Sequence, residues 1–496
     1  MFLNDLIKRF PEIDIKDLSC LRKRRGFDLS SLKAIDDTDV VICLGYEEAI
    51  YNHFEPWLQG KRKLIFIEKD IGVFQDLPKK PINNKRVDFF LLSLEDDDLI
   101  KKIVWSYFSL KYKLICHPEL MLDPICSYVK DTLRKIELGK HLAICDVADL
   151  GKKVFQNIAI NSRQLISKRG ANLKNAFEKV PAIICGAGPS ITGEIEKIGK
   201  IKEHALIFAG GSALNVLAKK GVTPHFSGGV DPGAPFEKFQ THLGFLTPFF
   251  YQMRISHENL SLIHHEPICF GESNGALFSN FLEDKFDLPS FSSGWCVGNF
   301  LSNIALYLGC DPIIFIGMDF SYTIGNKYAD STKGPSQDQV VQKDFVMAKE
   351  YTEKLINDHP HTKFINASQW GSDSLSDALP YKVQEDLEGL IHQRLQECPM
   401  LAFNKRDLED LYKSFMFCKD AFVKDFANSE KIVKKQSAFV YILSPVWNIF
   451  ASLILSQSKG DMMEEEKKMH QYVFFQKVID IYIEEIERAA CGRQNV

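Results

Sequence analysis

The loop Gly186–Ser190, with the sequence GAGPS, follows an apolar run near the middle of the chain. Its glycines allow the backbone to turn sharply and to approach a ligand closely, and Pro189 favours the first turn of a helix that we expect from about Ile191. Unpaired amides at the start of a helix attract a phosphate group. We therefore predict a phosphate-binding loop, with a helix-starting turn as the alternative. A bulky residue at Gly188 should block the ligand without unfolding the protein.

This loop differs from two familiar nucleotide-binding motifs. Ile191 occupies the position of the third glycine of the dinucleotide motif GxGxxG. No Gly-Lys-Ser/Thr triplet follows, as it would in a P-loop. Dinucleotide-dependent enzymes and P-loop kinases are therefore disfavoured.

Similar residues follow other apolar runs of this region. Gly210, Gly211 and Ser212 form a second small-residue turn, where bulky side chains would block a ligand. The segment HFSGGVDP places Asp231 just beyond a third run. A carboxylate there can bind ribose hydroxyls, hold a cation or act as a base, or it can merely cap a turn before a proline.

Later segments add the remaining candidate residues. Two further apolar runs are followed by polar residues, and another polar residue lies at the start of a predicted helix. A polar stretch then extends from Ser321 to about residue 342. These candidates are Glu272, Asn274, Asn299, Asp319, Lys327 and Tyr328. The stretch that contains Lys327 and Tyr328 has the composition of a mobile lid, or of an ordinary surface loop, and both side chains could meet a phosphate when it closes.

Apolar runs that alternate with helical segments must position these residues. The central section, residues 181–367, contains Ala182–Cys185, Ala205–Phe208, His225–Val230, Phe249–Arg254, Pro267–Phe270, Ile313–Ile316 and Lys363–Ile365. Parallel strands need crossover helices, so this alternation predicts an α/β fold with a mainly parallel, doubly wound sheet. Ligands of such sheets lie at the carboxyl ends of the strands, where the candidate residues are found.

Three further sections surround this centre. Residues 1–120 are predicted to form a smaller α/β domain with strands at Asp39–Leu44, Leu64–Ile67 and Val87–Leu92. Gly45 and Glu68 at its strand ends suit either a nucleotide-binding βαβ unit or a structural domain. Residues 121–180 are predicted to be a helical connector, helical to about residue 178, and residues 368–496 an all-α region.

Three asparagines interrupt the apolar pattern of the predicted connector. Asn157, Asn161 and Asn172 lie among its apolar positions. We expect them to face solvent or a neighbouring domain.

Composition excludes several classes of protein. The 496 residues carry 61 Lys and Arg against 65 Asp and Glu, a net charge of −4, whereas a dedicated nucleic-acid binder is usually basic. The twelve cysteines show no CxxC pair or metal-ligand spacing, so we expect reduced thiols and no metal site. Early charges such as Lys8 do not suit a signal peptide, which favours a cytoplasmic protein. The uncharged segment Ser437–Ser458 contains Pro445 and Asn448, and it favours a buried helical hairpin over a membrane or partner contact.

Several of these segments together resemble one family. Residues 182–232, residues 294–322, the KYAD of 327–330 and the FINAS of 364–368 resemble the motility accessory factor family of bacterial glycosyltransferases. The central domain of that family is related to 6-hydroxymethylpterin pyrophosphokinase-like proteins. Residues 40–70 also look like the family's N-terminal domain, so the resemblance extends from about residue 38 to 370.

The resemblance implies a sialyltransferase-like Rossmann fold and a reaction. A sialic-acid-like nonulosonic sugar would pass from a CMP-activated donor to Ser or Thr hydroxyls of a protein, typically flagellin. By matching position, the loop Gly186–Ser190 would face the phosphate and ribose of the donor, and Asp231 and Asn299 would shape the nucleotide pocket. Asp319 and Tyr328 would lie near the reacting centre. No cofactor is then expected, and neither a nucleic acid nor a membrane is an expected partner.

The chemistry of a CMP-sugar donor suits these residues. Breaking its glycosidic bond develops negative charge on the departing phosphate, which amides at helix starts stabilise, while Asp231 or Asp319 takes the proton of the acceptor hydroxyl. Two alternatives stay open. A pterin diphosphokinase would use ATP with Mg²⁺ and cationic phosphate clamps, for which Arg254 and Lys327 are the basic candidates. A non-catalytic adaptor would retain only the fold and dock partners through the apolar segment around Trp447.

Overall fold

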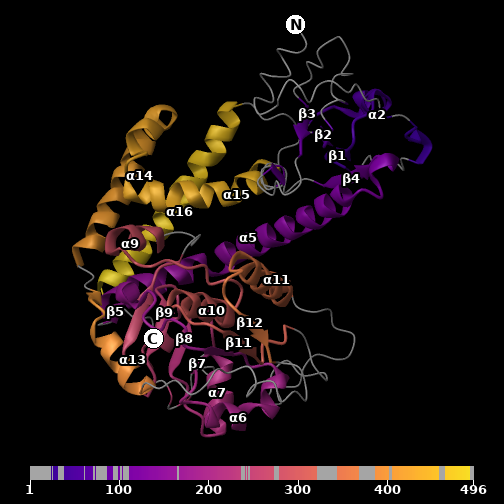
Figure 1. The fold of residues 1–496 in the computed structure, drawn as a ribbon. Helices are drawn as coiled ribbons and strands as arrows, with labels where there is room; N and C mark the ends of the chain where they lie inside the picture. The colour runs from indigo at the N-terminus through magenta and orange to yellow at the C-terminus, as the bar shows by residue number, and fades with distance from the viewer. Residues whose placement is uncertain are drawn as a thin grey trace. The chain divides into compact units, whose positions relative to one another are not determined.

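The structure is a computed structural model, shown as a ribbon in Figure 1. It describes residues 24, 26–31, 38–60, 62–70, 73, 86–92, 99–100, 103, 111–164, 167–235, 241, 243, 246–272, 279–320, 343–367, 386–401, 405–456 and 464–491. The chain divides into two compact units. One comprises residues 1–144 with 447–474, and the other comprises residues 145–446 with 475–496.

The first unit contains a four-stranded parallel sheet in the order β3-β2-β1-β4. Strands β1 (Val40–Leu44), β2 (Lys63–Glu68) and β3 (Val87–Leu91) confirm the predicted ones, and β4 (Tyr112–Cys116) was not predicted. All of β1 is buried because alternate residues enter apolar clusters on opposite faces of the sheet. The short helical elements of this unit are η2 (Leu29–Ser31), α2 (Glu48–Phe54), η3 (Glu55–Trp57) and η4 (Pro118–Leu120).

The second unit contains a nine-stranded sheet in the order β12-β11-β6-β7-β8-β9-β10-β5-β13. All of its neighbouring strands are parallel except β5 and β13. The α/β class and all seven predicted central strands are confirmed. The strands are β5 (Ser167–Arg169), β6 (Ala182–Cys185), β7 (Leu206–Gly210), β8 (Phe226–Gly229), β9 (Phe249–Gln252), β10 (Pro267–Phe270), β11 (Ile313–Ile316), β12 (Phe364–Asn366) and β13 (Met400–Leu401).

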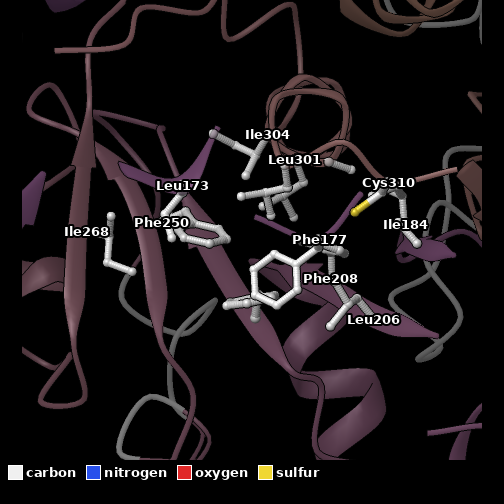
Figure 2. Packing of buried hydrophobic residues seen from close by; sticks show 14 of the residues in the cluster. Leu173, Phe177, Ile184, Leu206, Phe208, Phe250, Ile268, Leu301, Ile304 and Cys310 are labelled. Atoms are coloured by element: carbon white, nitrogen blue, oxygen red, sulfur yellow. The ribbon is translucent and has the colours of Figure 1, made fainter. Parts of the chain in front are cut away.

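The core of the central sheet lies under helix α10 (Val297–Tyr307). Figure 2 shows Leu301 and Ile304 of this helix above the aromatic side chains of the strands. Phe226 stacks on Phe208 at 5.2 Å and on Phe250 at 4.8 Å between ring centroids, and these rings come from the neighbouring strands β7, β8 and β9. Burial of each ring contributes roughly 1.5–3 kcal/mol, so this layer holds the strand ends in fixed register.

The remaining helices of the central section are short except α11. They are η5 (Gly170–Leu173), η6 (Pro189–Gly193), α6 (Ile195–Lys200), α7 (Ser212–Lys219), α8 (His257–Leu260), α9 (Ser279–Phe286) and α11 (Lys343–Asp358).

The predicted helical connector is one long helix that ends earlier than expected. Helix α5 spans Pro124–Gln164, and the Oδ1 atom of Asp123 accepts the amide hydrogen of Ile125 at 3.1 Å, which caps its start. The expected helix to residue 178 is wrong. Residues Ser167–Arg169 form β5 instead, because they pair with β10 at the edge of the central sheet.

The C-terminal region is mainly helical, as predicted, but it is not all-α, because Met400–Leu401 form β13 and pair with β5. Its elements are α13 (Leu387–Gln396), α14 (Lys405–Val433), η9 (Phe439–Leu443), α15 (Ser444–Ser456) and α16 (Glu464–Cys491). The expected hairpin at Ser437–Ser458 is wrong, because η9 is a π-helical turn that continues directly into α15. Pro445 lacks an amide hydrogen, which suits a position where the regular helical bonding is interrupted. Among the described helices, none has the combined length and apolarity that crossing a bilayer requires.

Candidate functional site

The order of strands in the central sheet changes direction between β6 and β11, which are parallel neighbours. From β6, strands β7 to β10 follow on one side, and β11 and β12 lie on the other. Ligands of doubly wound sheets bind outside the carboxyl ends of the strands at such a switch point. The loop Gly186–Ser190 follows β6, and Asp319 follows β11. The fold therefore brings together two predicted site segments that are 129 residues apart.

The amides of this loop already have partners within the protein. Gly186 donates to the carbonyl of Ile316 at 2.7 Å, and Gly188 donates to that of Gly317 at 2.8 Å. The amide of Ser190 donates to Asp319 Oδ2 at 3.1 Å. The expectation that these three amides are available to a phosphate is wrong for the structure as it stands. A donor contact with other atoms of the loop stays a prediction.

The helix predicted from about Ile191 is also shorter than expected. Pro189 begins the 3-10 turn η6, and α6 follows it with only six residues. A helix this short adds little of the dipole that would favour a phosphate. The loop is therefore a turn between a strand and a short helical segment.

Ser190 and Asp319 form the polar centre of the switch point. Besides its amide, Ser190 donates its hydroxyl to Asp319 Oδ1. Both residues are partly exposed. Hydrogen bonds to an ionised carboxylate are stronger than those between neutral groups, so Asp319 ties the end of β11 to the loop after β6.

Glycines at the strand ends allow one chain segment to approach another. A Cβ atom at Gly186 would lie 2.2 Å from the carbonyl oxygen of Gly317, and one at Gly210 would lie 2.3 Å from Cγ1 of Val297. These two glycines therefore serve packing within the protein. Gly211 differs, because no described atom lies within 4 Å of its Cβ position and its φ is +53°. It precedes Ser212, the first residue of α7, and it leaves the backbone open there.

A second polar group lies beyond strands β8, β9 and β10. Asp231 Oδ1 accepts the amide hydrogen of Gly233 at 2.8 Å, so the turn-capping role predicted as the alternative is confirmed. Arg254 Nη1 lies 2.6 Å from Oε1 of Glu272, and this pair is largely buried. The positive charge of Arg254 is thus balanced within the protein.

The two predicted catalytic carboxylates belong to different parts of the sheet edge. Asp319 follows β11 and Asp231 follows β8, and strands β6 and β7 lie between them. Three strand spacings of about 4.8 Å separate these strand ends by roughly 14 Å. A long donor could extend along this edge from one strand end to the other.

Asn299 is committed to the framework of the site. It is fully buried, its Oδ1 accepts the amide hydrogen of Trp295 at 3.1 Å, and its Nδ2 donates to Thr352 Oγ1 at 2.8 Å and to the carbonyl of Ala348 at 3.2 Å. These bonds join the start of α10 to α11. A direct contact with a nucleotide stays a prediction; through Nδ2 it would have to replace one of these bonds.

Burial keeps two titratable groups near the sheet neutral. It raises the pKa of Cys296, just before α10, to about 11, so this residue is a thiol at neutral pH and a poor nucleophile. Burial, helped by Lys202, lowers the pKa of His225 to about 4. Its Nδ1 accepts the amide hydrogen of Ile207 at 3.0 Å, so the imidazole has a structural role.

Three predicted site residues lie outside the described part of the chain. They are Asn274, Lys327 and Tyr328, together with the expected lid to about residue 342. Their roles stay predictions.

Gln252 is a strand-end residue that the sequence analysis did not select. It ends β9, and its Nε2 donates to the carbonyls of Gly271 at 3.0 Å and Phe291 at 2.9 Å. Its Oε1 is buried and has no hydrogen-bond partner among the described residues. A polar residue at the end of an apolar strand was the signal that could have found it.

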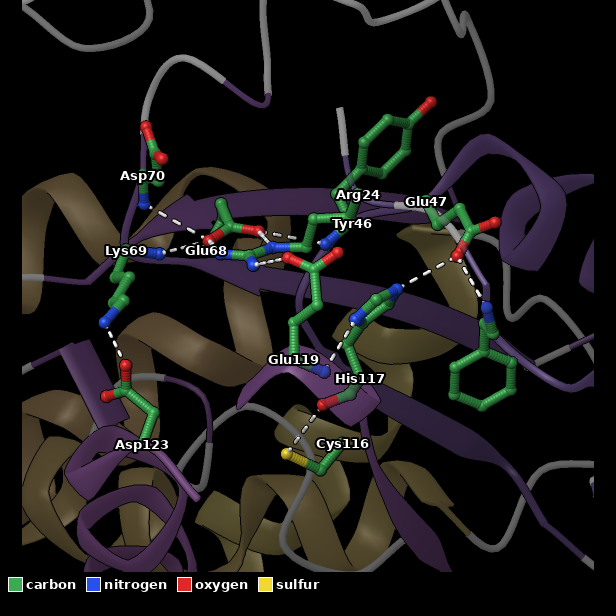
Figure 3. A network of polar contacts seen from close by, with 11 residues as sticks. Arg24, Tyr46, Glu47, Glu68, Lys69, Asp70, Cys116, His117, Glu119 and Asp123 are labelled. Carbon is green, nitrogen blue, oxygen red and sulfur yellow. Dashed lines mark hydrogen bonds and ion pairs between the residues drawn. The ribbon is translucent and has the colours of Figure 1, made fainter. Parts of the chain in front are cut away.

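In the first unit, the acidic end of β2 is occupied by the protein itself. Figure 3 shows Glu68 beside Arg24, whose Nε and Nη2 atoms donate to its carboxylate at 2.8 and 2.7 Å. The amides of Tyr46, Lys69 and Asp70 also donate to it. Glu68 is fully buried. The nucleotide-binding interpretation of this strand end is therefore wrong for the structure as described, and the structural alternative holds.

The centre of the chain is similar to a known protein family. Residues 156–325 match the family model described as MptE-like, 6-hydroxymethylpterin diphosphokinase MptE-like. An uncharacterized protein of Treponema pallidum (strain Nichols) is 33% identical over 114 residues, which are 23% of this chain and 51% of the relative. The chain thus spans about half the length of that curated relative.

One solved structure is similar over nearly the whole chain. It is the MAf glycosyltransferase from Magnetospirillum magneticum AMB-1, with a TM-score of 0.54 and 14% sequence identity. The match covers 92% of this chain and 80% of that chain. The likeness shows that this protein has the fold of a Maf-type glycosyltransferase.

Proposed function

We propose that this protein is a glycosyltransferase that transfers a sialic-acid-like nonulosonic sugar from a CMP-sugar donor to Ser or Thr hydroxyls of a protein, possibly a flagellin. The observation that carries the proposal is the extent of the fold likeness. It covers 92% of the chain, and the match to the diphosphokinase-like family model covers residues 156–325 alone. Because the likeness to the glycosyltransferase extends well beyond residues 156–325, it favours a glycosyltransferase over a diphosphokinase.

The donor would lie along the carboxyl edge of the central sheet. A nucleoside, a phosphate and a nine-carbon sugar form a long molecule, which suits carboxylates that follow strand ends roughly 14 Å apart. The open backbone at Gly211 lies between the strand ends that carry Asp231 and Asp319. We assign the two carboxylates to opposite ends of the donor, one toward the nucleoside and one toward the sugar.

The reaction needs one base and a stabilised leaving group. The acceptor hydroxyl attacks the anomeric carbon, its proton passes to a carboxylate, and the bond to the CMP phosphate breaks. Because the loop amides are bonded internally, the charge on the departing phosphate would be met by other donors. Lys327 and Tyr328 are proposed for this role, with Glu272 and Asn274 beside the donor.

Substitutions at the two carboxylates separate their roles. Asp231→Asn and Asp319→Asn are each assayed for release of CMP from CMP-nonulosonate in the presence of a Ser- and Thr-containing acceptor protein. The variant at the base should lose turnover by roughly 100-fold or more with little change in CMP affinity. The variant at the nucleoside end should chiefly weaken binding. Full activity in both variants would remove these carboxylates from the mechanism.

A second candidate function is supported by the family model. Its description is of a 6-hydroxymethylpterin diphosphokinase, which would need ATP, Mg²⁺ and a pterin. Arg254, the described cation near the strand ends that could clamp a phosphate, is paired with Glu272 at 2.6 Å. That pairing makes this candidate the weaker one.

Nucleotide titration distinguishes the candidates. The purified protein is titrated with CMP, with ATP and Mg²⁺, and with GTP, while its melting temperature and the binding heat are recorded. Stabilisation by CMP alone supports the glycosyltransferase, and stabilisation by ATP with Mg²⁺ supports the diphosphokinase. No response to any of them would favour an adaptor and would overturn the proposal.

A further inference from the structure

Helix α5 carries two asparagines one helical turn apart that are buried against the central sheet edge. Asn157 is fully buried and Asn161 is 1% exposed. Of the two predicted environments, solvent or a neighbouring domain, the structure shows the second, because both side chains reach loops that follow β8 and β9 of the central sheet. The large majority of buried polar side chains are hydrogen-bonded.

Asn161 holds the loop after β9. Its Nδ2 donates to the carbonyl of Met253 at 3.0 Å and to that of Ile255 at 2.9 Å. Both carbonyls lie beyond the end of β9, where no neighbouring strand bonds to them. A primary amide has two N–H groups on one atom, so a single side chain satisfies both carbonyls.

Asn157 joins that loop to the one after β8. Its Nδ2 donates to the carbonyls of Pro232 at 3.1 Å and Arg254 at 3.0 Å. Its Oδ1 accepts the backbone amide hydrogen of His257 at 3.2 Å and lies 2.9 Å from Nδ1 of that ring. One side chain thus fixes the two loops relative to each other.

These loops carry the polar residues of the second half of the candidate site. Asp231 precedes Pro232, and its carbonyl accepts the amide hydrogen of Ser256 at 3.1 Å. Arg254 lies in the loop after β9 and pairs with Glu272. The match to the family model begins at residue 156, so it includes both asparagines with the strands that they serve.

We propose that Asn157 and Asn161 are positioning residues, which hold the loops after β8 and β9 so that Asp231 meets the donor in a fixed geometry. The proposal rests on the proposed function. It adds that the end of α5, outside the sheet, is part of the donor-binding apparatus.

The test compares Asn161→Ala and Asn157→Ala with Ile158→Ala. Ile158 is fully buried on the same helix, but its side chain has no hydrogen-bonding group. All variants are studied as the full chain, well below the lowest melting temperature, with circular dichroism to establish folding. Asn161→Asp adds a variant that keeps the shape of the side chain and loses both N–H donors.

Two measurements are made on each variant. Hydrogen exchange of peptides covering residues 231–235 and 253–257 reports whether the loops are held. The Kd for CMP, with KM and kcat for a CMP-sugar, reports whether the donor site depends on them. We expect faster exchange of both peptides and a Kd raised roughly tenfold in the asparagine variants, with kcat reduced as well. Ile158→Ala should lower the melting temperature and change the Kd less than about twofold.

Each outcome decides the question. Equal Kd values for the asparagine variants and the wild type, or Kd values that follow the melting temperature in all variants including Ile158→Ala, would reduce the asparagines to a structural role. Unchanged exchange of the two peptides would overturn the holding of the loops. A wild-type protein that does not bind CMP overturns the proposed function and with it the link to the donor, while the exchange measurement still tests the holding of the loops.

Discussion

Gly188 offers a sharp test of how the switch point is built. A Cβ atom added there would lie 2.6 Å from Cγ and Oδ2 of Asp319 and 2.7 Å from the carbonyl oxygen of Gly317. The contact at Gly317 is with a backbone atom in a turn with φ of +69°, so the oxygen cannot move away as a flexible side chain could. The Asp319 side chain can move only by giving up the hydrogen bonds that it accepts from Ser190.

The expected cost of Gly188→Ala follows from these contacts. Overpacking costs roughly 1–3 kcal/mol, and loss of a hydrogen bond to a charged group costs about 1.5–3 kcal/mol. Because relief of one contact partly relieves the other, we expect the free energy of unfolding to fall by about 2–4 kcal/mol. For the second unit, which comprises residues 145–446 and 475–496, that corresponds to a drop in melting temperature of roughly 3–6 °C. The sequence alone predicted a blocked ligand without unfolding, whereas the structure adds a loss of stability.

Gly193→Ala is the matched control. It lies at the end of η6, and no described atom is within 4 Å of its Cβ position. The free energy of unfolding of the Gly193→Ala variant should differ from that of the wild type by less than about 0.5 kcal/mol. Chemical denaturation of both variants, followed by tryptophan fluorescence and calorimetry, gives the comparison. A Gly188→Ala variant as stable as Gly193→Ala would refute the close packing of Asp319 against the loop.

Three further changes have defined outcomes. Burial lowers the pKa of His225 to about 4 from 6.5, so between these pH values the unfolded chain binds more protons than the folded one. The free energy of unfolding of the wild type should therefore fall by up to about 3 kcal/mol, relative to His225→Asn, as the pH drops from 6.5 to 4 in pH-dependent denaturation. Glu68→Gln removes the buried partner of Arg24 and leaves it the partly exposed Glu119, and it should destabilise the first unit by about 3–5 kcal/mol in the same assay. Glu119→Gln should cost much less, and similar losses in the two variants would contradict the assignment. Asn299→Ala removes the bonds between α10 and α11 and should cost about 2 kcal/mol, and an unchanged melting temperature would argue that these bonds are dispensable.

The buried strands of the central sheet were predictable because their signal is local. Runs such as Ala182–Cys185 and Ile313–Ile316 are apolar on both faces, which is typical of parallel strands covered by helices. The edge strand Ser167–Arg169 has no such signal. It is short and polar, and only its pairing with β10 makes it a strand. The same pairing ended the helical connector earlier than its apolar spacing indicated.

The candidate site was predictable by residue type and less so by contact. Small residues after β6 and β7 indicated close approach, but the sequence could not tell whether a ligand or another chain segment approaches. At Gly186 and Gly210 the structure shows that it is the chain. For Asn157 the sequence left solvent and a neighbouring domain open for a related reason, because a single polar residue on an amphipathic helix has the same pattern whether it meets solvent or a buried carbonyl.

The sequence by itself determined where seven strands of the central sheet lie, which residues follow them, and that the sheet is mainly parallel and doubly wound. Periodicity and turn residues act over a few positions, so they can be read from a short window. Only the tertiary structure decided that β11 lies beside β6, and that Asp319 therefore bonds to Ser190, 129 residues away in the sequence. It also decided that Arg24 pairs with Glu68. Such contacts depend on which strands pair and which loops bury their polar groups, and this is settled by the packing of the whole domain rather than by any one segment.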